Sequence, residues 1–248
     1  MISEKPWSAD AVLRLGLGIL MTVSLGLCAA SLLQSEKLAM TAGHREFAQM
    51  ALTGLFLQGG ILVWIWFFLR EIPISWSEAF GLEAPGRAKA VLWGAAGAVL
   101  FLPAGLGLQS LLGFLVELVT RHPAAPQELV NVLQKADLPW WEQVFAGVLA
   151  VMIAPVAEEM LFRGILYPTL KQRGFPRAAW WVTSLLFAGV HCNGLSFLPL
   201  LVFSLVLIYL YEKTGSLWAS ITAHSLFNYA NFLLLMLWAE DRPLLPVR

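Results

Sequence analysis

The chain has 248 residues, of which 58% are apolar and only 13% are charged, and its formal net charge is zero. A typical soluble domain carries about 25% charged residues, so this composition argues against a soluble globular protein. The zero net charge gives no reason to expect nucleic-acid binding. Cys28 and Cys192 are far apart and show no metal-ligand or redox spacing, so we expect both to be small, buried hydrophobic residues.

Seven apolar segments follow one another along the chain, and most approach the about 20 residues that a helix needs to cross a bilayer. They are residues 11–33, 48–69, 89–119, 141–167, 177–191, 195–212 and 216–238. The first is too long for the apolar part of a signal peptide, so we expect it to remain as a membrane anchor. The third contains Pro103 and several Gly, which predicts a tilted or kinked span. The pattern predicts an all-α, polytopic transmembrane bundle of about seven or eight helices.

Most connections between these segments are short. Residues 72–88 form a polar loop, and residues 127–137 place apolar side chains on one face. The second pattern fits either a short amphipathic helix at the membrane interface or a packed loop helix. Lys and Arg are more numerous in the loops on the N-terminal side, which favours a cytoplasmic N-terminus.

Strongly polar side chains occur inside the fourth segment, where a charged residue costs about 2.5–3.5 kcal/mol on insertion scales and usually marks a site or pathway. Glu159 and Arg163 are four residues apart on one helical face, and we expect them to form an ion pair in a network between helices. Glu158 is rotated by about 100° from Glu159 and has no local partner. It is therefore the candidate general base or acid. Pro155 should loosen the helix just before the acids.

Two histidines and a carboxamide extend this polar set. His191 ends the fifth segment, and we expect Asn193 to cap the helix that follows. His224 and Asn228 are four residues apart on one face of the last segment. Alone, they would be an interhelical hydrogen-bond pair, worth about 0.6 kcal/mol in membranes. Together with Glu158 they can form one hydrated pocket for amide hydrolysis, in which Glu158 and His191 activate water and His224 and Asn228 donate to the oxyanion.

Three motifs resemble those of a known family. Glu-Glu-x-x-x-Arg at residues 158–163, Phe-x-x-x-His at 187–191 and His-x-x-x-Asn at 224–228 are similar, in type and order, to the motifs of the CAAX protease and bacteriocin-processing (CPBP, or ABI) intramembrane proteases. The resemblance covers residues 141–237 and is to type II CAAX prenyl proteases in particular. It implies a helical membrane fold with a polar catalytic cavity inside the membrane.

The resemblance also implies endopeptidase activity and a role for each motif residue. Glu158 is then the catalytic acid or base, Glu159 pairs with Arg163, and His191, His224 and Asn228 complete the site. Residues 1–139 would supply N-terminal membrane helices and loops, and residues 140–240 the catalytic core, within a single membrane domain. In the eukaryotic branch of the family, the substrate is a prenylated protein that loses its C-terminal tripeptide.

The sequence leaves the use of a metal open. The family is often labelled as metalloproteases, and Glu158, His191 and His224 are a possible zinc set that would leave a position for water. The chain has no His-Glu-x-x-His helix, and we favour a glutamate mechanism without a metal or other cofactor. A Gly-x-Ser-x-Gly elbow is also lacking, which disfavours a covalent serine nucleophile.

The expected partners are the lipid bilayer and a peptide or protein substrate, for which a prenylated tail is one candidate. The expected location is a prokaryotic inner membrane, crossed several times. Two other classes of function compete with this interpretation. A non-enzymatic scaffold or bacteriocin-immunity protein would tolerate Glu158→Gln except for effects on stability. A transporter with a proton-relay carboxylate would need inverted repeats, and the two halves show no internal similarity.

Overall fold

The computed structural model describes residues 4–34, 40–83, 86–122 and 139–240, and every regular element in these ranges is helical. In chain order, the elements are α1 (Ala9–Leu32), α2 (Ala42–Gly54), the π-helical turn η1 (Leu55–Gly59), α3 (Gly60–Arg70), α4 (Trp76–Phe80), α5 (Arg87–Thr120), α7 (Trp140–Val148), the π-helical turn η2 (Leu149–Ile153), α8 (Ala154–Glu159), the π-helical turn η3 (Met160–Leu166), α9 (Tyr167–Gln172), α10 (Pro176–Gly189), α11 (Gly194–Thr214) and α12 (Leu217–Glu240). The predicted all-α class is confirmed.

Five helical stretches within the described ranges are long and apolar enough to cross a membrane. They are Ala9–Leu32, Ala42–Arg70, Arg87–Thr120, Trp140–Gln172 and Gly194–Thr214. Each predicted apolar segment has a helical counterpart, although α10 has only 14 residues. The polar loop contains a short helix that the sequence did not indicate, α4. The amphipathic segment predicted at residues 127–137 lies outside the described residues.

Side chains at the helix ends explain several boundaries. The Ser8 and Thr41 hydroxyls accept hydrogen bonds from first-turn backbone N–H groups of α1 and α2. Asn193 caps α11 as predicted, because its side chain accepts from the Ser196 N–H at 3.0 Å. Pro103 does not end α5, which continues through it as one helix of 34 residues.

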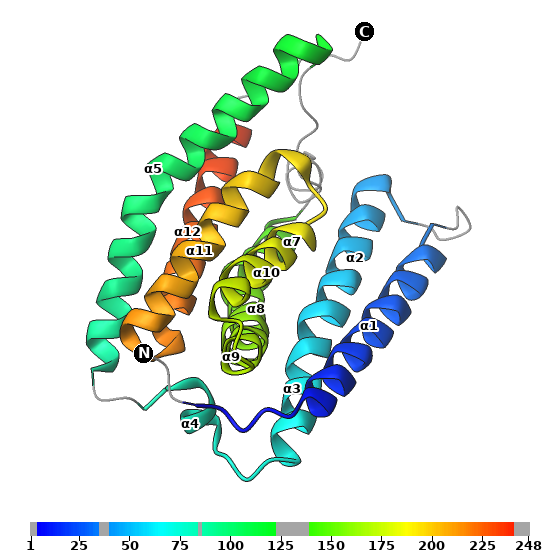
Figure 1. Cartoon of the computed structure of the whole chain (residues 1–248). Helices are drawn as coiled ribbons and strands as arrows, with labels where there is room; N and C mark the ends of the chain where they lie inside the picture. Colours follow the sequence, from blue (N-terminus) through cyan, green and yellow to red (C-terminus); the bar gives the residue numbers. More distant parts are fainter. Residues whose placement is uncertain (1–3, 35–39, 84–85, 123–138, 241–248) are drawn as a thin grey trace, which may run out of the picture.

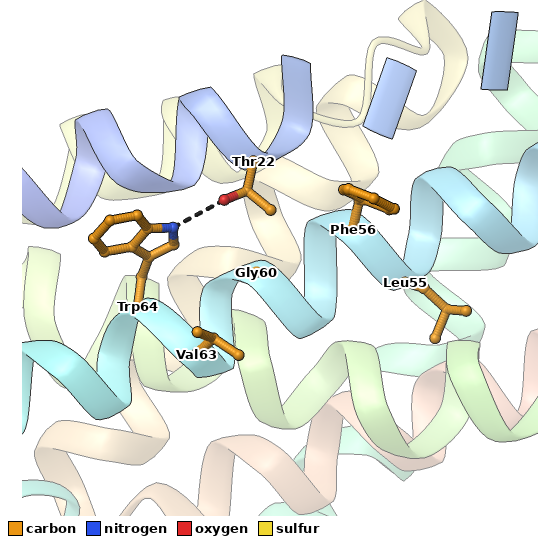
Figure 2. Close-up of a pocket in the computed structure, with 6 residues that line it drawn as sticks. All are labelled: Thr22, Leu55, Phe56, Gly60, Val63 and Trp64. Atoms are coloured by element: carbon orange, nitrogen blue, oxygen red, sulfur yellow. Dashed lines mark hydrogen bonds between the residues drawn. The ribbon is translucent and has the colours of Figure 1, made fainter. Parts of the chain in front are cut away.

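Small residues let α1 approach the continuous helix formed by α2, η1 and α3. A Cβ atom at Gly18 would lie 2.5 Å from the Trp64 ring, and one at Gly26 would lie 2.5 Å from the Phe56 Cβ. Between these contacts, Trp64 Nε1 donates to the Thr22 hydroxyl at 2.9 Å (Figure 2). Trp64, Thr22 and Phe56 also line a pocket on this side of the helix pair. The packing is typical of membrane helices, where small residues bring backbones together.

The helix that carries the acidic motif lies in the middle of the bundle (Figure 1). On one side are α1 to α3, and on the other are α5, α11 and α12. A shared core joins the two sides and includes Trp7, Ile65, Ala157, Ile165 and Ile208. The acidic motif is therefore built into contacts from both halves of the chain.

The prediction that both cysteines are buried is wrong, because Cys28 and Cys192 are both exposed. Cys28 lies on α1, where Leu17, Leu20 and Leu25 are also largely exposed. In a membrane-spanning helix the lipid is as apolar as the core, so apolar character does not predict burial. Cys192 lies in the turn between α10 and α11 with a φ of 48°.

Candidate active site

The helix of the acidic motif is interrupted by π turns on both sides of its acids, η2 and η3. At the end of η2, the Ala154 N–H bonds to the Leu149 carbonyl. Pro155 has no N–H to offer. The Ala150 carbonyl therefore receives no donor from the residue four or five positions later, and Asn228 Nδ2 of α12 donates to it at 2.8 Å. The helix is locally loosened where Pro155 predicted it, and π turns of this kind are frequent at functional sites.

Glu159 and Arg163 form the predicted ion pair, and both side chains are fully buried. Arg163 Nη1 donates to Glu159 Oε1 at 2.9 Å, and Nη2 donates to the Ser204 hydroxyl of α11 at 2.7 Å. His224 Nδ1 of α12 lies 2.9 Å from the same Glu159 oxygen. The Arg163 guanidinium also lies 4.3 Å from the centre of the Phe187 ring of α10. This network connects four helices, so its main effect is to hold them in a fixed arrangement.

Glu158 has different surroundings from its neighbour. Its side chain is 14% exposed, whereas that of Glu159 is not exposed at all. Its Oε1 accepts a hydrogen bond from Gln58 Nε2 at 3.0 Å. Its Oε2 has no hydrogen-bond partner among the described residues and lies 3.8 Å from His224 Nε2. Of the two acids, only Glu158 has a partly exposed side chain, although the Oε2 atom of Glu159 is likewise buried without a partner among the described residues.

His224 is held with its second nitrogen toward Glu158. An ionised carboxylate only accepts hydrogen bonds, so Nδ1 donates to Glu159 and leaves Nε2 on the Glu158 side. The ring is almost fully buried and packs edge-on against Phe187 and Phe203, with centroids 5.6 Å and 5.8 Å away. The sequence motif thus brings together a carboxylate oxygen and an imidazole nitrogen on adjacent helices.

His191 is not in contact with the acids. It lies exposed in the turn after α10, its Nδ1 is 2.7 Å from the Phe187 carbonyl, and its ring centre is 5.0 Å from that of Phe187. His191 and His224 therefore both pack against the Phe187 ring. Within the described ranges, no group of three His, Cys, Asp or Glu side chains is arranged to hold a metal ion, so Glu158, His191 and His224 are not assembled as a zinc set.

Asn228 uses its carboxamide on the backbone of the acidic helix. One N–H donates to the Ala150 carbonyl, and the NH₂ group has a second N–H for another acceptor. The structure therefore gives Asn228 a contact with the helix that carries the acidic motif, and its role in the site stays a prediction.

Sequence reasoning missed Gln58 and Ser204. It found no usable motif in the first 120 residues, yet Gln58 is a lone carboxamide inside an apolar span and is 6% exposed. Such a residue is costly in a membrane and could have been noticed for that reason. Its contact with Glu158 could not have been predicted, since the two residues are 100 positions apart along the chain.

Part of the chain is similar to a known protein family. Residues 139–230 match the family model described as type II CAAX prenyl endopeptidase Rce1-like. This stretch is similar to the Rce1-like family. It begins just before α7, ends within α12 and contains all three motifs.

A curated relative of the chain is Putative membrane peptidase YdiL of Bacillus subtilis (strain 168). It is 24% identical over 167 residues, which cover 67% of this chain and 64% of the relative. No solved structure matches the chain. Helices α1 to α5, and Gln58 with them, precede the Rce1-like region.

Proposed function

We propose that the protein is an intramembrane endopeptidase in which Glu158 acts on water. The observation that carries this proposal is that two adjacent acids have different surroundings. Glu159 is fully buried and its Oε1 is bonded to Arg163 and His224, whereas the Glu158 side chain is 14% exposed and its Oε1 is bonded to Gln58. The Oε2 atom of each acid is buried without a hydrogen-bond partner among the described residues, and that of Glu158 lies 3.8 Å from His224 Nε2. A structural network alone needs no second acid beside the Glu159–Arg163 pair, because a charged group at membrane depth is costly.

The proposed reaction uses the groups on either side of the 3.8 Å gap. Glu158 Oε2 takes a proton from a water molecule, whose oxygen attacks the carbonyl carbon of the scissile peptide bond. The donors for the oxyanion of the tetrahedral intermediate are the second N–H of Asn228 and the Nε2–H of His224, which the ring carries only when it is doubly protonated, since its Nδ1–H is bonded to Glu159. Glu158 then gives its proton to the leaving nitrogen as the C–N bond breaks, which restores the carboxylate.

His191 is proposed as the second group that orients the water. Its ring lies beside Phe187 at the exposed end of α10, so this role needs a closer approach to Glu158 when substrate binds. Catalytic hydrogen bonds are often long in free enzymes and shorten in the substrate complex. The Rce1-like family supports a prenylated protein tail as substrate, and another membrane-associated peptide is the alternative.

The test is peptide cleavage by purified protein with and without Glu158. Quenched-fluorescence peptides with and without a prenyl group would be offered to the wild type, Glu158→Gln and Glu142→Gln. Glu142 is the matched control because it is a buried acid of the same long helix, paired with His44. We expect Glu158→Gln to lose at least about 100-fold in kcat and Glu142→Gln to retain activity. Full activity in Glu158→Gln would end the proposal.

A chelator separates the two mechanisms. Under the metal-free glutamate mechanism that we favour, wild-type cleavage continues when the chelator is added. Loss of cleavage that added zinc restores would assign the protein to the metalloproteases instead.

A further inference from the structure

The Glu158 carboxylate is held by a residue outside the Rce1-like region. Gln58 lies in η1, at the centre of the span Ala42–Arg70, and is 6% exposed. Its neighbours Leu55 and Leu57 are 46% and 36% exposed and face outward. Leu55 also lines the pocket on the α1 side of this helix (Figure 2). Gln58 is thus the polar residue on the inner side of an otherwise apolar turn.

Close packing brings this turn to the acidic helix. A Cβ atom at Gly54, one turn before Gln58, would lie 2.7 Å from Leu149 Cδ2 at the start of η2. The missing side chain therefore lets the two helices approach. One turn later, Gln58 reaches across and donates from Nε2 to Glu158 Oε1 at 3.0 Å.

This hydrogen bond fixes the direction of the carboxylate. With Oε1 engaged by Gln58, Oε2 is the oxygen that faces His224 Nε2. The carboxamide makes no other bond within the described residues, since Gln58 Oε1 is buried without a partner there.

We propose that Gln58 is a positioning residue for Glu158, so that the N-terminal helix α2–η1–α3 forms part of the reaction site. The inference rests on the proposed endopeptidase function. Gln58 acts through Glu158 and needs no contact with the substrate. The bond holds the carboxylate in the orientation in which Oε2 can take a proton from water.

The first test compares Gln58→Met with Gln49→Met. Methionine keeps the length of glutamine and removes its hydrogen bonds. Gln49 is the matched control, because it lies on the same long helix and donates from Nε2 across to the Ala30 carbonyl of α1 at 3.2 Å. We expect Gln58→Met to lower kcat by about tenfold to a hundredfold with KM changed less than about twofold, since substrate binding is untouched. Gln49→Met should leave both values unchanged.

A purely structural role gives another pattern. Gln58→Met would then unfold more easily than Gln49→Met, and kcat of the folded fraction would equal that of the wild type. That result would overturn the inference and leave the endopeptidase function standing.

The second test needs no activity. Dicyclohexylcarbodiimide reacts with protonated carboxyl groups in membranes, and mass spectrometry locates the label at Glu158. Losing the Gln58 donor leaves the Glu158 carboxyl group without its hydrogen bond from the protein, while the other charged or titratable groups near it, Glu159, Arg163 and His224, stay in place. We expect faster labelling of Glu158 in Gln58→Met and wild-type labelling in Gln49→Met.

The two tests separate the two claims. If the wild type cleaves no peptide but Gln58→Met labels faster, the endopeptidase function fails and the positioning contact stands. If labelling of Glu158 is the same in all three proteins, Gln58 does not position the carboxylate.

Discussion

Glu158 and Glu159 are adjacent, yet their carboxylates meet opposite surroundings. Glu159 Oε1 receives bonds from Arg163 and His224 and is fully buried. Glu158 Oε1 receives one bond, from Gln58, and its side chain is partly exposed, whereas the Oε2 atom of each acid has no partner among the described residues. A helix makes this difference possible, because successive residues point about 100° apart. The same chemical change should therefore have different consequences at the two positions.

Glu159→Gln should destabilise the fold far more than Glu158→Gln. Removing the charge of Glu159 leaves the Arg163 guanidinium fully buried without its counter-ion, which costs about 3 kcal/mol or more. Glu158 has no such cationic hydrogen-bond partner, so its replacement should change the free energy of unfolding by less than about 1 kcal/mol. Unfolding in mixed detergent–SDS micelles, followed by tryptophan fluorescence, measures both variants. Equal losses would mean that Glu159 and Arg163 do not depend on each other.

At the scale of the element, the helix of the acidic motif depends on a neighbour to complete its backbone. Ala154 bonds to Leu149, Pro155 has no N–H, and the Ala150 carbonyl is satisfied by Asn228 of α12. A proline that opens one helix is thus matched by a carboxamide on another. Membrane helices tolerate proline when neighbours satisfy the freed backbone groups in this way.

This dependence predicts a coupled pair of mutations. Asn228→Leu should cost about 1–3 kcal/mol by leaving the Ala150 carbonyl without a donor. In a Pro155→Ala background the new N–H can bond within the helix, so the cost of losing Asn228 should be smaller. A double-mutant cycle on the free energy of unfolding should give a coupling of at least about 0.5 kcal/mol. Strict additivity would show that Asn228 does not substitute for the missing helical donor.

The contact between α5 and α12 makes a further prediction at this scale. A Cβ atom at Gly94 would lie 2.3 Å from the Ala219 carbonyl oxygen, a backbone atom that cannot rotate away. Gly94→Ala should therefore destabilise the protein by about 1–3 kcal/mol. Gly107→Ala is the control on the same helix, because a Cβ atom at Gly107 would meet nothing within 4 Å; it should be neutral or stabilising, since alanine favours helix over glycine. Thermal unfolding in detergent distinguishes the two, and similar melting temperatures would contradict the close approach.

At the scale of the whole molecule, the sequence predicted the helices and the contacts within one helix, but it did not predict most contacts between helices. Apolar runs located every long helix of the bundle, and the spacing of Glu159 and Arg163 predicted their pair. The partner of Glu158 was not predictable, because no periodicity relates it to Gln58 at 100 residues' distance. Lipid removes the difference between inside and outside that hydropathy reports in soluble proteins, which is why Cys28 was wrongly expected to be buried.

The segment before α1 is in contact with the helix that carries the acidic motif. Trp7 precedes α1, is 7% exposed, and packs against Phe68 of α3 with ring centres 5.1 Å apart. Its Nε1 donates to the Gly164 carbonyl, just after Arg163, at 3.1 Å. Gly164 is needed there, because a Cβ atom would lie 2.5 Å from the Phe80 ring of α4. The segment before α1 is therefore fixed to the turn that carries the buried arginine.

Trp7→Ala should weaken the whole bundle by releasing this junction. Loss of a buried tryptophan costs about 3–5 kcal/mol through lost burial and the cavity left behind, and Trp7→Phe should cost less because the ring contact with Phe68 survives. Trp140→Ala is the control, since Trp140 is 75% exposed. Unfolding in SDS–detergent mixtures gives the free energies, and limited proteolysis in the same micelles reports whether the segment before α1 is released.

If Trp7→Ala and Trp140→Ala unfold alike and resist protease alike, the N-terminal segment does not support the site. If only Trp7→Ala is cleaved near the N-terminus, and its kcat falls while Trp140→Ala keeps wild-type values, the contact at Gly164 connects the stability of the first helices to the geometry of Glu158.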